Sequence, residues 1–371
     1  MVEWKKLGEV ANLVRGRVIS KDYIRDFEGE YPVYSSQTAN DGVLGSINSY
    51  MFDGEYLTWT TDGAYAGTIF RRKGKFSITN VCGLIDITCR NIKQDFLYFW
   101  LSKTAKDYVL EGMGNPKLMS NVASTILIPI PSLSEQQRIV GILDTFTSAI
   151  DNLKEQIAQR RKQYEYYRDQ LLDLEGKPGV EMKTLGDVCI KTSNIRWKNT
   201  SDNEAFKYID LSSVNRDTHT IDNVLEINKD NAPSRAQQIV YKGDVILGTT
   251  RPTLRRYCQI PQQYDNQICS TGFCIYRANK DVVLNRWLFH NIGNRNFWDY
   301  CELKQQGAGY PCLSNSDAFA YIIPVPSLQE QERIVSILDT FESSIQNLEA
   351  QLSQREKQYK YYRNKLLTFE R

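Results

Sequence analysis

Apolar side chains recur at alternating intervals of four and three residues through two long segments of the chain, residues 139–174 and 334–369. A heptad pattern sustained over this length, with charged flanking positions, predicts coiled-coil helices. Each series misses one position, which holds Arg160 in the first segment and Arg355 in the second; these arginines could lock the register, contact a partner or extend to solvent. The first series is Ile139, Leu143, Phe146, Ile150, Leu153, Ile157, Tyr164, Tyr167, Leu171 and Leu174, and the second is Ile334, Leu338, Phe341, Ile345, Leu348, Leu352, Tyr359, Tyr362, Leu366 and Phe369.

The two helical segments are copies of each other. Residues 128–175 and 323–370 align without a gap and are identical at 31 of 48 positions. In each copy a proline is followed by a serine, and a glutamate stands three residues after that serine, which is the capping-box pattern of a helix start. Upstream, GMGNPKL matches GAGYPCL, and LGEV near the start of the chain matches LGDV. The chain is therefore predicted to be a tandem duplication in which the segments between these anchors have diverged.

The order of the segments predicts how the helices run. The first helix leads from one diverged segment to the other, and the second helix follows that second segment, so paired helices would run antiparallel. About forty helical residues make a rod of roughly 60 Å. We therefore expect an α+β chain with two mixed α/β heads at opposite ends of an antiparallel coiled coil, related by approximate two-fold symmetry. The predicted parts are the first head (1–127), the first helix and linker (128–180), the second head (181–322) and the second helix (323–371).

Both heads carry short strands in a similar order. Alternation predicts a strand at 54–60 in the first head, and apolar runs predict strands at 243–247 and 272–276 in the second. A glycine and an acidic residue before a strand, a threonine-rich turn and a basic cluster recur in both, which favours one fold with two different surfaces. The other predicted elements are helices at 95–106 and 284–293 and turns at 62–63 and 73–75.

Composition narrows the class of protein. Hydrophobic residues make up 41% and charged residues 24% of the 371, as in globular proteins of two or three domains. With no apolar run of 18 residues and no signal-peptide core, a cytoplasmic protein with eight reduced cysteines is expected. The chain has only two histidines, no CxxC pair and no Walker A, GxSxG or HExxH motif. These features favour a binding protein over an enzyme, with no metal or cofactor of its own.

The net charge of +2 does not by itself indicate a nucleic-acid partner, so DNA would have to be met by local patches. Threonines and basic residues gather at corresponding places in the two heads, and their hydroxyl and guanidinium groups suit phosphate oxygens and guanine edges. An ordinary solvated turn is the alternative for each cluster. The candidate DNA-binding residues are Thr60, Thr61, Arg71, Arg72, Lys73 and Lys75 in the first head and Thr249, Thr250, Arg251, Arg255 and Arg256 in the second.

Two further polar segments are candidates for contact with bases. The first opens a loop rich in hydrogen-bond donors and acceptors, although it could also be a simple turn. The second follows a proline and would either present an arginine from a rigid turn or begin a helix. Their residues are Tyr34, Ser35, Ser36 and Gln37 in the first head and Ser234 and Arg235 in the second.

These motifs together resemble those of a known family. The repeated IPxPSLxEQxRIVxILDxF segment, continuing into a helix that ends YYRxxLL, is similar to the conserved regions of the specificity subunit of type I restriction–modification systems. YPVYSSQTANDG, GEYLTWTTDGAYAGTIF and SITNVCGL resemble one group of that family's target-recognition domains, and NAPSRAQ and STGFCIYRA resemble another. The resemblance covers essentially the full chain.

The resemblance implies a non-catalytic subunit. Each head would read one half of a bipartite, asymmetric site in double-stranded DNA, and the coiled coil would fix the unread spacer. Two modification (methyltransferase) subunits carrying S-adenosylmethionine would dock on the repeated helices and methylate adenine N6, and restriction subunits using ATP and Mg²⁺ are possible further partners. The helix-start residues that match the partner-binding segment are Gln136, Arg138, Gln331 and Arg333.

Three other interpretations stay open on the sequence alone. The chain could be a coiled-coil scaffold without DNA affinity, a nuclease or methylase with unrecognised motifs, or a DNA reader that serves another phage-defence effector. Diverged heads rich in tyrosine and arginine favour a reader over a scaffold. The bases that are read depend on loop geometry, which composition does not give.

Overall fold

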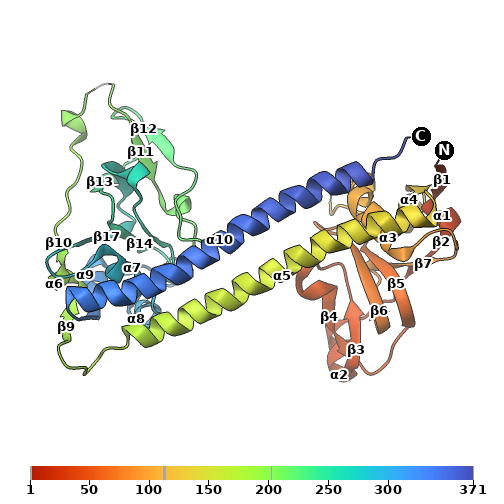
Figure 1. Ribbon diagram of the computed structural model, residues 1–371, viewed down its shortest axis with the longest axis horizontal. Helices are drawn as coiled ribbons and strands as arrows, with labels where there is room; N and C mark the ends of the chain where they lie inside the picture. Colours follow the sequence, from red (N-terminus) through yellow and green to blue (C-terminus); the bar gives the residue numbers. More distant parts are fainter. Residues whose placement is uncertain (1, 112–113, 202, 371) are drawn as a thin grey trace. The chain divides into compact units, whose positions relative to one another are not determined.

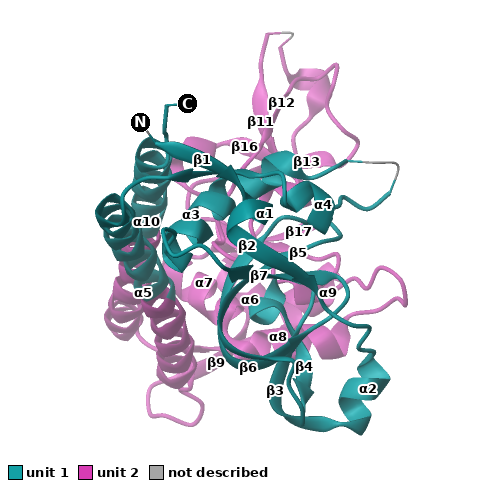
Figure 2. Ribbon diagram, turned by 90° about the vertical axis from the view of Figure 1, so that its right-hand side faces the viewer, with its two compact units in different colours: residues 1–154, 350–371 teal, residues 155–349 magenta. Residues whose placement is uncertain are grey.

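The computed structural model describes residues 2–111, 114–201 and 203–370. The chain forms two compact units: unit 1 combines Met1–Lys154 with Ala350–Arg371, and unit 2 is Glu155–Glu349. Two long helices, α5 (Leu133–Leu172) and α10 (Leu328–Leu366), belong partly to each unit, so that both change colour along their length in Figure 2. Each unit therefore contains one predicted head together with a part of both helices.

The head in unit 1 is built on one six-stranded sheet in the order β2-β7-β5-β6-β3-β4 (Figure 1). Its strands pair antiparallel, except that β3 runs parallel to β6. A separate two-stranded ribbon joins β1 to β8, the strand just before α5. The strands are β1 (Glu3–Lys6), β2 (Ala11–Arg15), β3 (Glu28–Tyr34), β4 (Val43–Ile47), β5 (Phe52–Thr60), β6 (Ile69–Ile78), β7 (Cys82–Ile87) and β8 (Leu127–Ile130).

The helices of unit 1 are short, apart from its share of α5 and α10. They are α1 (Leu7–Val10), α2 (Lys21–Asp26), α3 (Gln94–Thr104) and α4 (Ser120–Ala123), with 3₁₀ turns at Ala39–Gly42 and Ala105–Tyr108. The helix predicted at 95–106 is thus confirmed as α3, and the strand predicted at 54–60 lies within β5. The turn predicted at 73–75 is wrong, because those residues lie inside β6 and pair with β5.

The head in unit 2 has two four-stranded sheets, β10-β17-β14-β15 and β12-β11-β16-β13. A ribbon of β9 and β18 corresponds to the β1–β8 ribbon of unit 1. The strands are β9 (Glu181–Thr184), β10 (Cys189–Ile190), β11 (Phe206–Ile209), β12 (Leu225–Ile227), β13 (Ala236–Val240), β14 (Val245–Gly248), β15 (Tyr257–Gln259), β16 (Gln267–Ser270), β17 (Phe273–Ala278) and β18 (Ile322–Val325).

The helices of unit 2 include the one that was predicted at 284–293. They are α6 (Leu185–Val188), α7 (Asn285–Gly293), α8 (Arg295–Lys304) and α9 (Asn315–Ala320), with 3₁₀ turns at Trp197–Asn199, Leu211–Ser213, Pro252–Leu254 and Gln262–Tyr264. The predicted strands at 243–247 and 272–276 correspond to β14 and β17. None of the helices in the described part of the chain combines the length and apolar character needed to cross a bilayer.

The two heads share one topology, as predicted. The order β2-β7-β5-β6 matches β10-β17-β14-β15, and the parallel pair β3–β6 matches β11–β16. The difference is that the long strands β5 and β6 are each replaced by two shorter strands, β13 with β14 and β15 with β16. The first break falls at residues 241–244, a turn that contains Gly243 at a φ of 91° and in which the Asp244 carboxylate accepts the Tyr241 amide proton at 2.8 Å.

The core of unit 1 packs α3 and the start of α5 against the sheet. Trp59 of β5 is fully buried, and its indole N–H donates to the Leu118 carbonyl at 2.9 Å. Gly83 on the neighbouring strand makes room for that indole, because a Cβ there would lie 2.2 Å from the ring. The loop that carries Leu118 is therefore fixed to the centre of the sheet.

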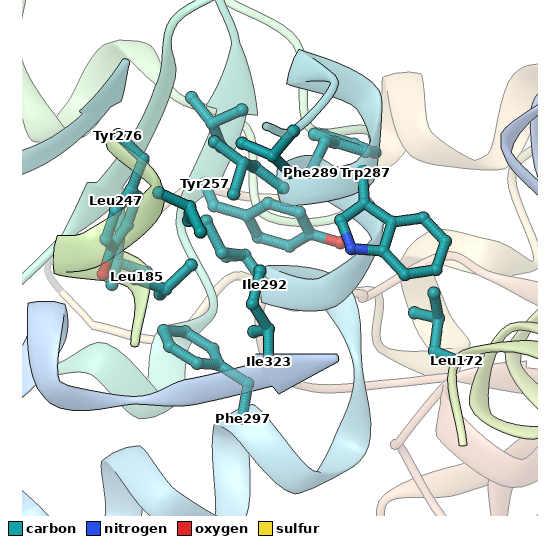
Figure 3. Packing of buried hydrophobic residues seen from close by; sticks show 14 of the residues in the cluster. Leu172, Leu185, Leu247, Tyr257, Tyr276, Trp287, Phe289, Ile292, Phe297 and Ile323 are labelled. Carbon is teal, nitrogen blue, oxygen red and sulfur yellow. The ribbon is translucent and has the colours of Figure 1, made fainter. Parts of the chain in front are cut away.

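The main core cluster of unit 2 is rich in aromatic side chains (Figure 3). Trp287, Phe297 and Tyr276 are buried completely, and the Trp287 indole N–H donates to the Pro324 carbonyl at 2.9 Å. Leu172 from the end of α5 and Leu338 from α10 belong to the same cluster. Parts of both long helices therefore contribute to the core of the head.

Within each unit the two long helices run antiparallel. In unit 1 the Phe146 and Tyr362 rings stack at 5.2 Å, and Lys154 lies 3.9 Å from Glu356. In unit 2 the Tyr167 and Phe341 rings stack at 5.4 Å, and Arg161 pairs with Glu349 at 2.6 Å. Partners of rising number in α5 have falling numbers in α10, which confirms the antiparallel coiled coil in both units.

The arginines that interrupt the heptads lie on these aromatic pairs. The Arg160 guanidinium is 5.8 Å from the Phe341 ring centroid, and Arg355 is 5.8 Å from Phe146. Each phenylalanine therefore has a stacked tyrosine and an arginine as neighbours, in the same arrangement in both units. Both helices end slightly earlier than predicted, because Leu174 lies beyond the end of α5 at Leu172 and Phe369 lies beyond the end of α10 at Leu366.

The helix starts follow the predicted cap only in part. The Ser132 hydroxyl accepts the Glu135 amide proton at 3.3 Å, and Ser327 does the same for Glu330. The glutamate side chain does not complete the box. It pairs with an arginine three residues further on, Arg138 in the first copy.

Candidate nucleic-acid interface

Four segments of unit 1 converge on one edge of its head, and we call them loop cluster 1: residues 34–37, 60–63, 79–81 and 115–118. The Thr79 amide donates to the Tyr34 carbonyl at 2.9 Å, and the Thr61 amide donates to the Val81 carbonyl at 3.1 Å. Residues 115–118 join through two bonds, from Gly63 N–H to the Pro116 carbonyl and from Leu118 N–H to the Thr61 carbonyl.

Unit 2 builds the same frame from the corresponding segments, loop cluster 2: residues 233–235, 249–251, 270–272 and 310–313. The Thr271 amide donates to the Arg235 carbonyl at 2.9 Å, and the Thr249 amide donates to the Gly272 carbonyl at 2.9 Å. Residues 310–313 join through Arg251 N–H to the Pro311 carbonyl and Leu313 N–H to the Thr249 carbonyl. The repeated GxGxPxL motif thus closes a loop cluster in each head; Gly112 and Met113 of the first copy lie outside the described residues.

Loop cluster 1 includes the predicted polar segment from Tyr34 to Gln37. Tyr34 is the last residue of β3, and Ser35 to Gln37 continue from it as a half-buried loop. The Ser35 hydroxyl lies 3.1 Å from the Thr79 hydroxyl, and the Gln37 amide nitrogen donates to the Val43 carbonyl. Ser36 is half-buried in the middle of the loop. These contacts give the segment a fixed shape.

Thr60 and Thr61 support loop cluster 1 from inside. Both are fully buried. The Thr60 hydroxyl donates to the Tyr65 carbonyl and accepts the Thr68 amide proton, and the Thr61 hydroxyl donates to the Asp62 carboxylate. Their predicted role as direct DNA contacts is wrong in this conformation, because neither hydroxyl reaches the surface. They hold the turn that presents Asp62.

The basic cluster of β6 is divided between the two faces of the strand. Arg72 is only 3% exposed, and it donates to the Thr58 hydroxyl at 3.1 Å and to Asp41 at 2.6 Å. Its guanidinium lies 3.6 Å from the Tyr34 ring centroid. Arg72 is therefore not available to DNA as predicted; it braces the Tyr34 segment from within the sheet.

Arg71, Lys73 and Lys75 point to the opposite face from Arg72, since side chains alternate along a strand. Arg71 is engaged by two carboxylates, Asp95 at 2.9 Å and Asp144 at 3.1 Å, and so links β6 to the helices. Lys73 pairs with Glu55 at 2.7 Å, and the Lys75 ammonium lies 4.8 Å from the Tyr50 ring centroid. Lys73 and Lys75 are exposed and remain predicted contacts, whereas Arg71 is part of the helix anchor.

In unit 2 the exposed candidates lie on loop cluster 2 or beside it. Ser234 and Arg235 form an exposed turn before β13, so the helix start that was the alternative for them is wrong. Arg251 is exposed and lies 4.3 Å from the Tyr310 ring centroid. Thr249 is buried and donates to the Gly272 carbonyl at 2.9 Å, so it is a support and not a direct contact.

The remaining candidates of unit 2 surround the Pro252–Leu254 turn. Arg255 is exposed, with its guanidinium 5.8 Å from the Trp298 ring centroid. Thr250 and Arg256 are half-buried. These three stay predictions, together with Arg251, Ser234 and Arg235.

The two glutamines that were predicted to bind a partner are instead buried and hydrogen-bonded to the main chain. Gln136 and Gln331 are both fully buried. The Gln136 carbonyl oxygen accepts the Lys93 amide proton at 2.8 Å, and its nitrogen donates to the carbonyls of Asn91 and Pro131 at 2.7 and 2.9 Å. Burial removes these side chains from any partner surface, so the prediction is wrong for both glutamines.

Gln331 makes the matching bonds in unit 2. Its oxygen accepts the Leu284 amide proton at 3.0 Å, and its nitrogen donates to the carbonyls of Val282 and Pro326 at 3.0 and 2.9 Å. We call this arrangement the glutamine clamp, because it ties the start of each long helix to the segment before α3 or α7. The signal in the sequence was an identical uncharged polar residue in both copies, next to the apolar heptad.

Arg138 and Arg333 fit the predicted partner surface better, since both are exposed. Each pairs with the glutamate three residues earlier, at 2.7 Å, and this hydrogen bond lowers the pKa of Glu135 and of Glu330. Such exposed pairs contribute little to stability. Their contact with a partner remains a prediction.

The described residues contain no group of three or more His, Cys, Asp or Glu side chains placed to hold a metal ion. Burial raises the pKa of the Cys82 and Cys189 thiols to about 12, which leaves them unreactive. A cavity of about 440 Å³ in unit 2 lies between residues 216–220 and the helices α5, α7 and α10. Five arginines and four carboxylates line it, so it has no strong excess of positive charge for a phosphate-bearing cofactor.

Comparison with known proteins agrees with this geometry. The family model of the type I restriction modification DNA specificity domain matches residues 1–160 and 178–356. The chain belongs to this family. A putative type I specificity subunit of Mycoplasma pneumoniae, S.MpnORF507P, is 31% identical over 377 residues, which is 97% of this chain and 96% of the relative.

Other members of the type I specificity family match one half or the fold. The type I restriction enzyme MpnII specificity subunit of Mycoplasma pneumoniae is 41% identical over 169 residues, 44% of this chain and 51% of that one. The crystal structure of the type I restriction-modification system S subunit from M. genitalium matches 100% of this chain and 97% of its own with a TM-score of 0.65. Its 14% identity makes this a likeness of fold. As a specificity subunit, the chain recognises DNA sequence, and its loop clusters are the candidate reading surfaces.

Proposed function

We propose that loop clusters 1 and 2 each read one half of a bipartite, asymmetric site in double-stranded DNA, for adenine-N6 methyltransferase subunits that the repeated helices recruit. The observation that carries this proposal is a shared main-chain frame with different side chains at equivalent positions. Cluster 1 presents Asp62 and Lys117 where cluster 2 presents Thr250 and Cys312. An asymmetric site needs two unlike readers of the same build, because its halves differ in sequence.

The duplication of the helices supports two modification subunits, one for each copy. Tyr166 and Tyr361 occupy equivalent positions and are 62% and 61% exposed, and exposed aromatic residues are enriched at protein interfaces. The charged pairs at Arg138 and Arg333 are duplicated in the same way. In this proposal S-adenosylmethionine, ATP and Mg²⁺ belong to the partner subunits, which also flip the target adenine, and this chain has no catalytic activity of its own.

Methylated-base mapping tests the proposal. The chain is co-expressed with its modification subunit, and genomic N6-methyladenine is mapped in cells with and without this chain. A single bipartite motif that depends on this chain is the expected result. Methylation without a motif, or a motif that is unchanged when the chain is absent, would refute it.

Exchange of residues 1–127 for the first head of another family member tests the division of labour. Only one half of the methylated motif should change, because loop cluster 2 is untouched. A change in both halves would contradict independent reading by the two clusters.

The long helices are proposed to set the number of unread base pairs. Removal of residues 156–159 together with 351–354 shortens both copies by four residues and should change the spacer or abolish methylation. Removal from exposed surface loops of the same total length serves as the control. An unaltered spacer at full activity would exclude the ruler.

A further inference from the structure

Loop cluster 2 contains an arginine, Arg251, with an unfavourable backbone conformation. Arg251 has φ of 50° and ψ of 61°, in the left-handed region of backbone conformations that residues other than glycine rarely adopt. Such conformations are unfavourable for a residue with a Cβ, and they concentrate at functional sites.

Loop cluster 1 shows what this position requires of the main chain. Gly63 donates its amide to the Pro116 carbonyl as Arg251 donates to Pro311, so the two residues are equivalent. Gly63 also has a positive φ, of 93°, and for glycine this costs nothing. The frame therefore calls for glycine, and unit 2 has an arginine there in spite of the strain.

The Arg251 side chain packs against a residue of another loop. Its guanidinium lies 4.3 Å from the ring centroid of Tyr310, which is itself 71% exposed on the GxGxPxL loop. The two loops are joined directly, because Arg251 N–H donates to the Pro311 carbonyl at 2.6 Å. The following Pro252 starts a 3₁₀ turn and fixes the chain on the other side. No carboxylate among the described residues forms an ion pair with Arg251 in this structure.

We propose that Arg251, seated on Tyr310, is a specificity-determining residue that reads a guanine in the half-site recognised by unit 2. An arginine fork can donate two hydrogen bonds to the O6 and N7 of guanine, and a stacked aromatic ring limits the directions in which the fork points. This inference rests on the proposed function, since it names a contact of loop cluster 2 with DNA.

The strain supplies a test in which stability and recognition move in opposite directions. Arg251→Gly relieves the backbone, so the protein should unfold at the same temperature or a higher one. It should nevertheless lose discrimination at one position of one half-site by about 5- to 150-fold, the equivalent of one bidentate contact. Tyr310→Ala should weaken the same position less, and Tyr310→Phe should retain it, because the ring and not the hydroxyl faces the guanidinium.

The experiment measures methylation by the assembled complex on a library in which each base of the site is varied. Arg251→Lys keeps the charge but not the fork, and Arg295→Ala on α8, where Arg295 is exposed, serves as a surface control. A loss confined to a guanine in one half-site supports the proposal. Equal loss on all sequences, rescued by Arg251→Lys, would mean a phosphate contact and would overturn it.

Failure of the inference can be told from failure of the proposed function. If Arg251→Gly keeps the discrimination of the wild-type complex at every position, Arg251 is not a reader, although the wild-type complex still recognises its site. If the wild-type complex shows no sequence preference, the proposed function itself is wrong.

Discussion

The two units hold the same aspartate of the repeated helix with arginines that come from different elements. In unit 1, Asp144 pairs at 3.1 Å with Arg71, which lies on β6. In unit 2, the equivalent Asp339 pairs at 2.6 Å with Arg286, which lies on α7. The position on α3 that corresponds to Arg286 is Asp95, and it also pairs with Arg71.

The comparison shows that the helix fixes where a positive charge is needed but not which strand or helix supplies it. Both guanidinium groups also lie on an aromatic ring at 4.3 Å: Arg71 of β6 on Tyr98 of α3, and Arg286 on Phe289 of its own helix α7. The same local environment has thus been kept while its source in the sequence has changed. Diverged heads can therefore fit one conserved scaffold.

The surroundings of the two arginines differ in depth. Arg286 also contacts Glu342, and Asp339 accepts a hydrogen bond from the fully buried His290 at 2.9 Å. Tyr164 of α5 closes this group, because its hydroxyl contacts both His290 and Glu342 at 3.0 Å. Unit 1 has Phe99 where unit 2 has His290, so its anchor is a simple pair of carboxylates around one arginine.

The largest contrast is expected from removing each arginine. Arg286→Ala leaves two carboxylates in a half-buried site and should destabilise unit 2 by about 2–4 kcal/mol, whereas Arg71→Ala, in a more exposed site, should cost unit 1 about 1 kcal/mol or less. Hydrogen exchange resolved by peptide measures the two units separately. Equal losses in both units would show that the buried group adds nothing.

The glutamine clamps are expected to be alike in the two units. Gln136→Ala and Gln331→Ala each leave one amide proton and two carbonyls without their partner in the core, at a cost of about 2–3 kcal/mol. Urea unfolding with peptide-resolved exchange should place each loss in its own unit. Gln137→Ala, the exposed neighbour on the same helix, should change stability by less than about 0.5 kcal/mol. A large effect of this control would undermine the comparison.

Acid should loosen unit 2 alone, because both histidines of the chain lie there. Burial lowers the pKa of His219 to about 4 and also lowers the pKa of His290, which faces Asp339, Arg286, Glu342 and Tyr164. Below a pH of about 6.5 the histidines of the unfolded chain bind protons, whereas those of the folded unit stay neutral. The free energy of unfolding therefore falls as the pH drops from there toward 4.

Each histidine can change the free energy of unfolding by at most about 1.4 kcal/mol per pH unit between pH 6.5 and 4. Urea midpoints at pH 7.5 and 5.0 provide the measurement. His290→Phe, which copies the residue of unit 1, should reduce the acid sensitivity, and His219→Gln should reduce it independently. If unit 1 loosened as much as unit 2, the histidines would not be the cause.

The smallest effects are expected at the aromatic pairs of the coiled coil, where the units match. Phe146→Leu and Phe341→Leu each lose a stacked tyrosine and an arginine contact, and each should cost about 1 kcal/mol. Thermal unfolding of the two variants should shift by the same amount. A clear inequality would reveal an asymmetry in the helices that their matching contacts do not show.

The helices, the duplication and the shared topology of the heads could be predicted from the sequence because they depend on local periodicity. A heptad repeats its signal every two helical turns, and the second copy repeats the whole series. The basic run from Arg71 to Lys75 was misread because its glycine suggested a turn, whereas Gly74 lies inside β6 at a φ of 86°. Reading the run as a strand would have placed Arg72 opposite its neighbours.

Contacts between residues far apart in sequence could not be predicted in this way. The Gln136 side chain is bonded to main-chain atoms more than forty residues upstream, and nothing in the local pattern distinguishes it from the exposed Gln137 beside it. The pairing of Arg251 with the GxGxPxL loop depends equally on which strands are neighbours. Identity between the two copies is the signal that deserves more weight at polar positions.

The glutamine clamp bonds only peptide groups: in each unit these are one N–H and one carbonyl of the head and the carbonyl of the proline just before the long helix. Because every partner of the glutamine is a main-chain group, these hydrogen bonds do not depend on the side chains of the head. A head of different sequence can therefore replace the present one without a compensating change in the helix. New DNA specificities would then arise by exchange of whole heads instead of by gradual substitution.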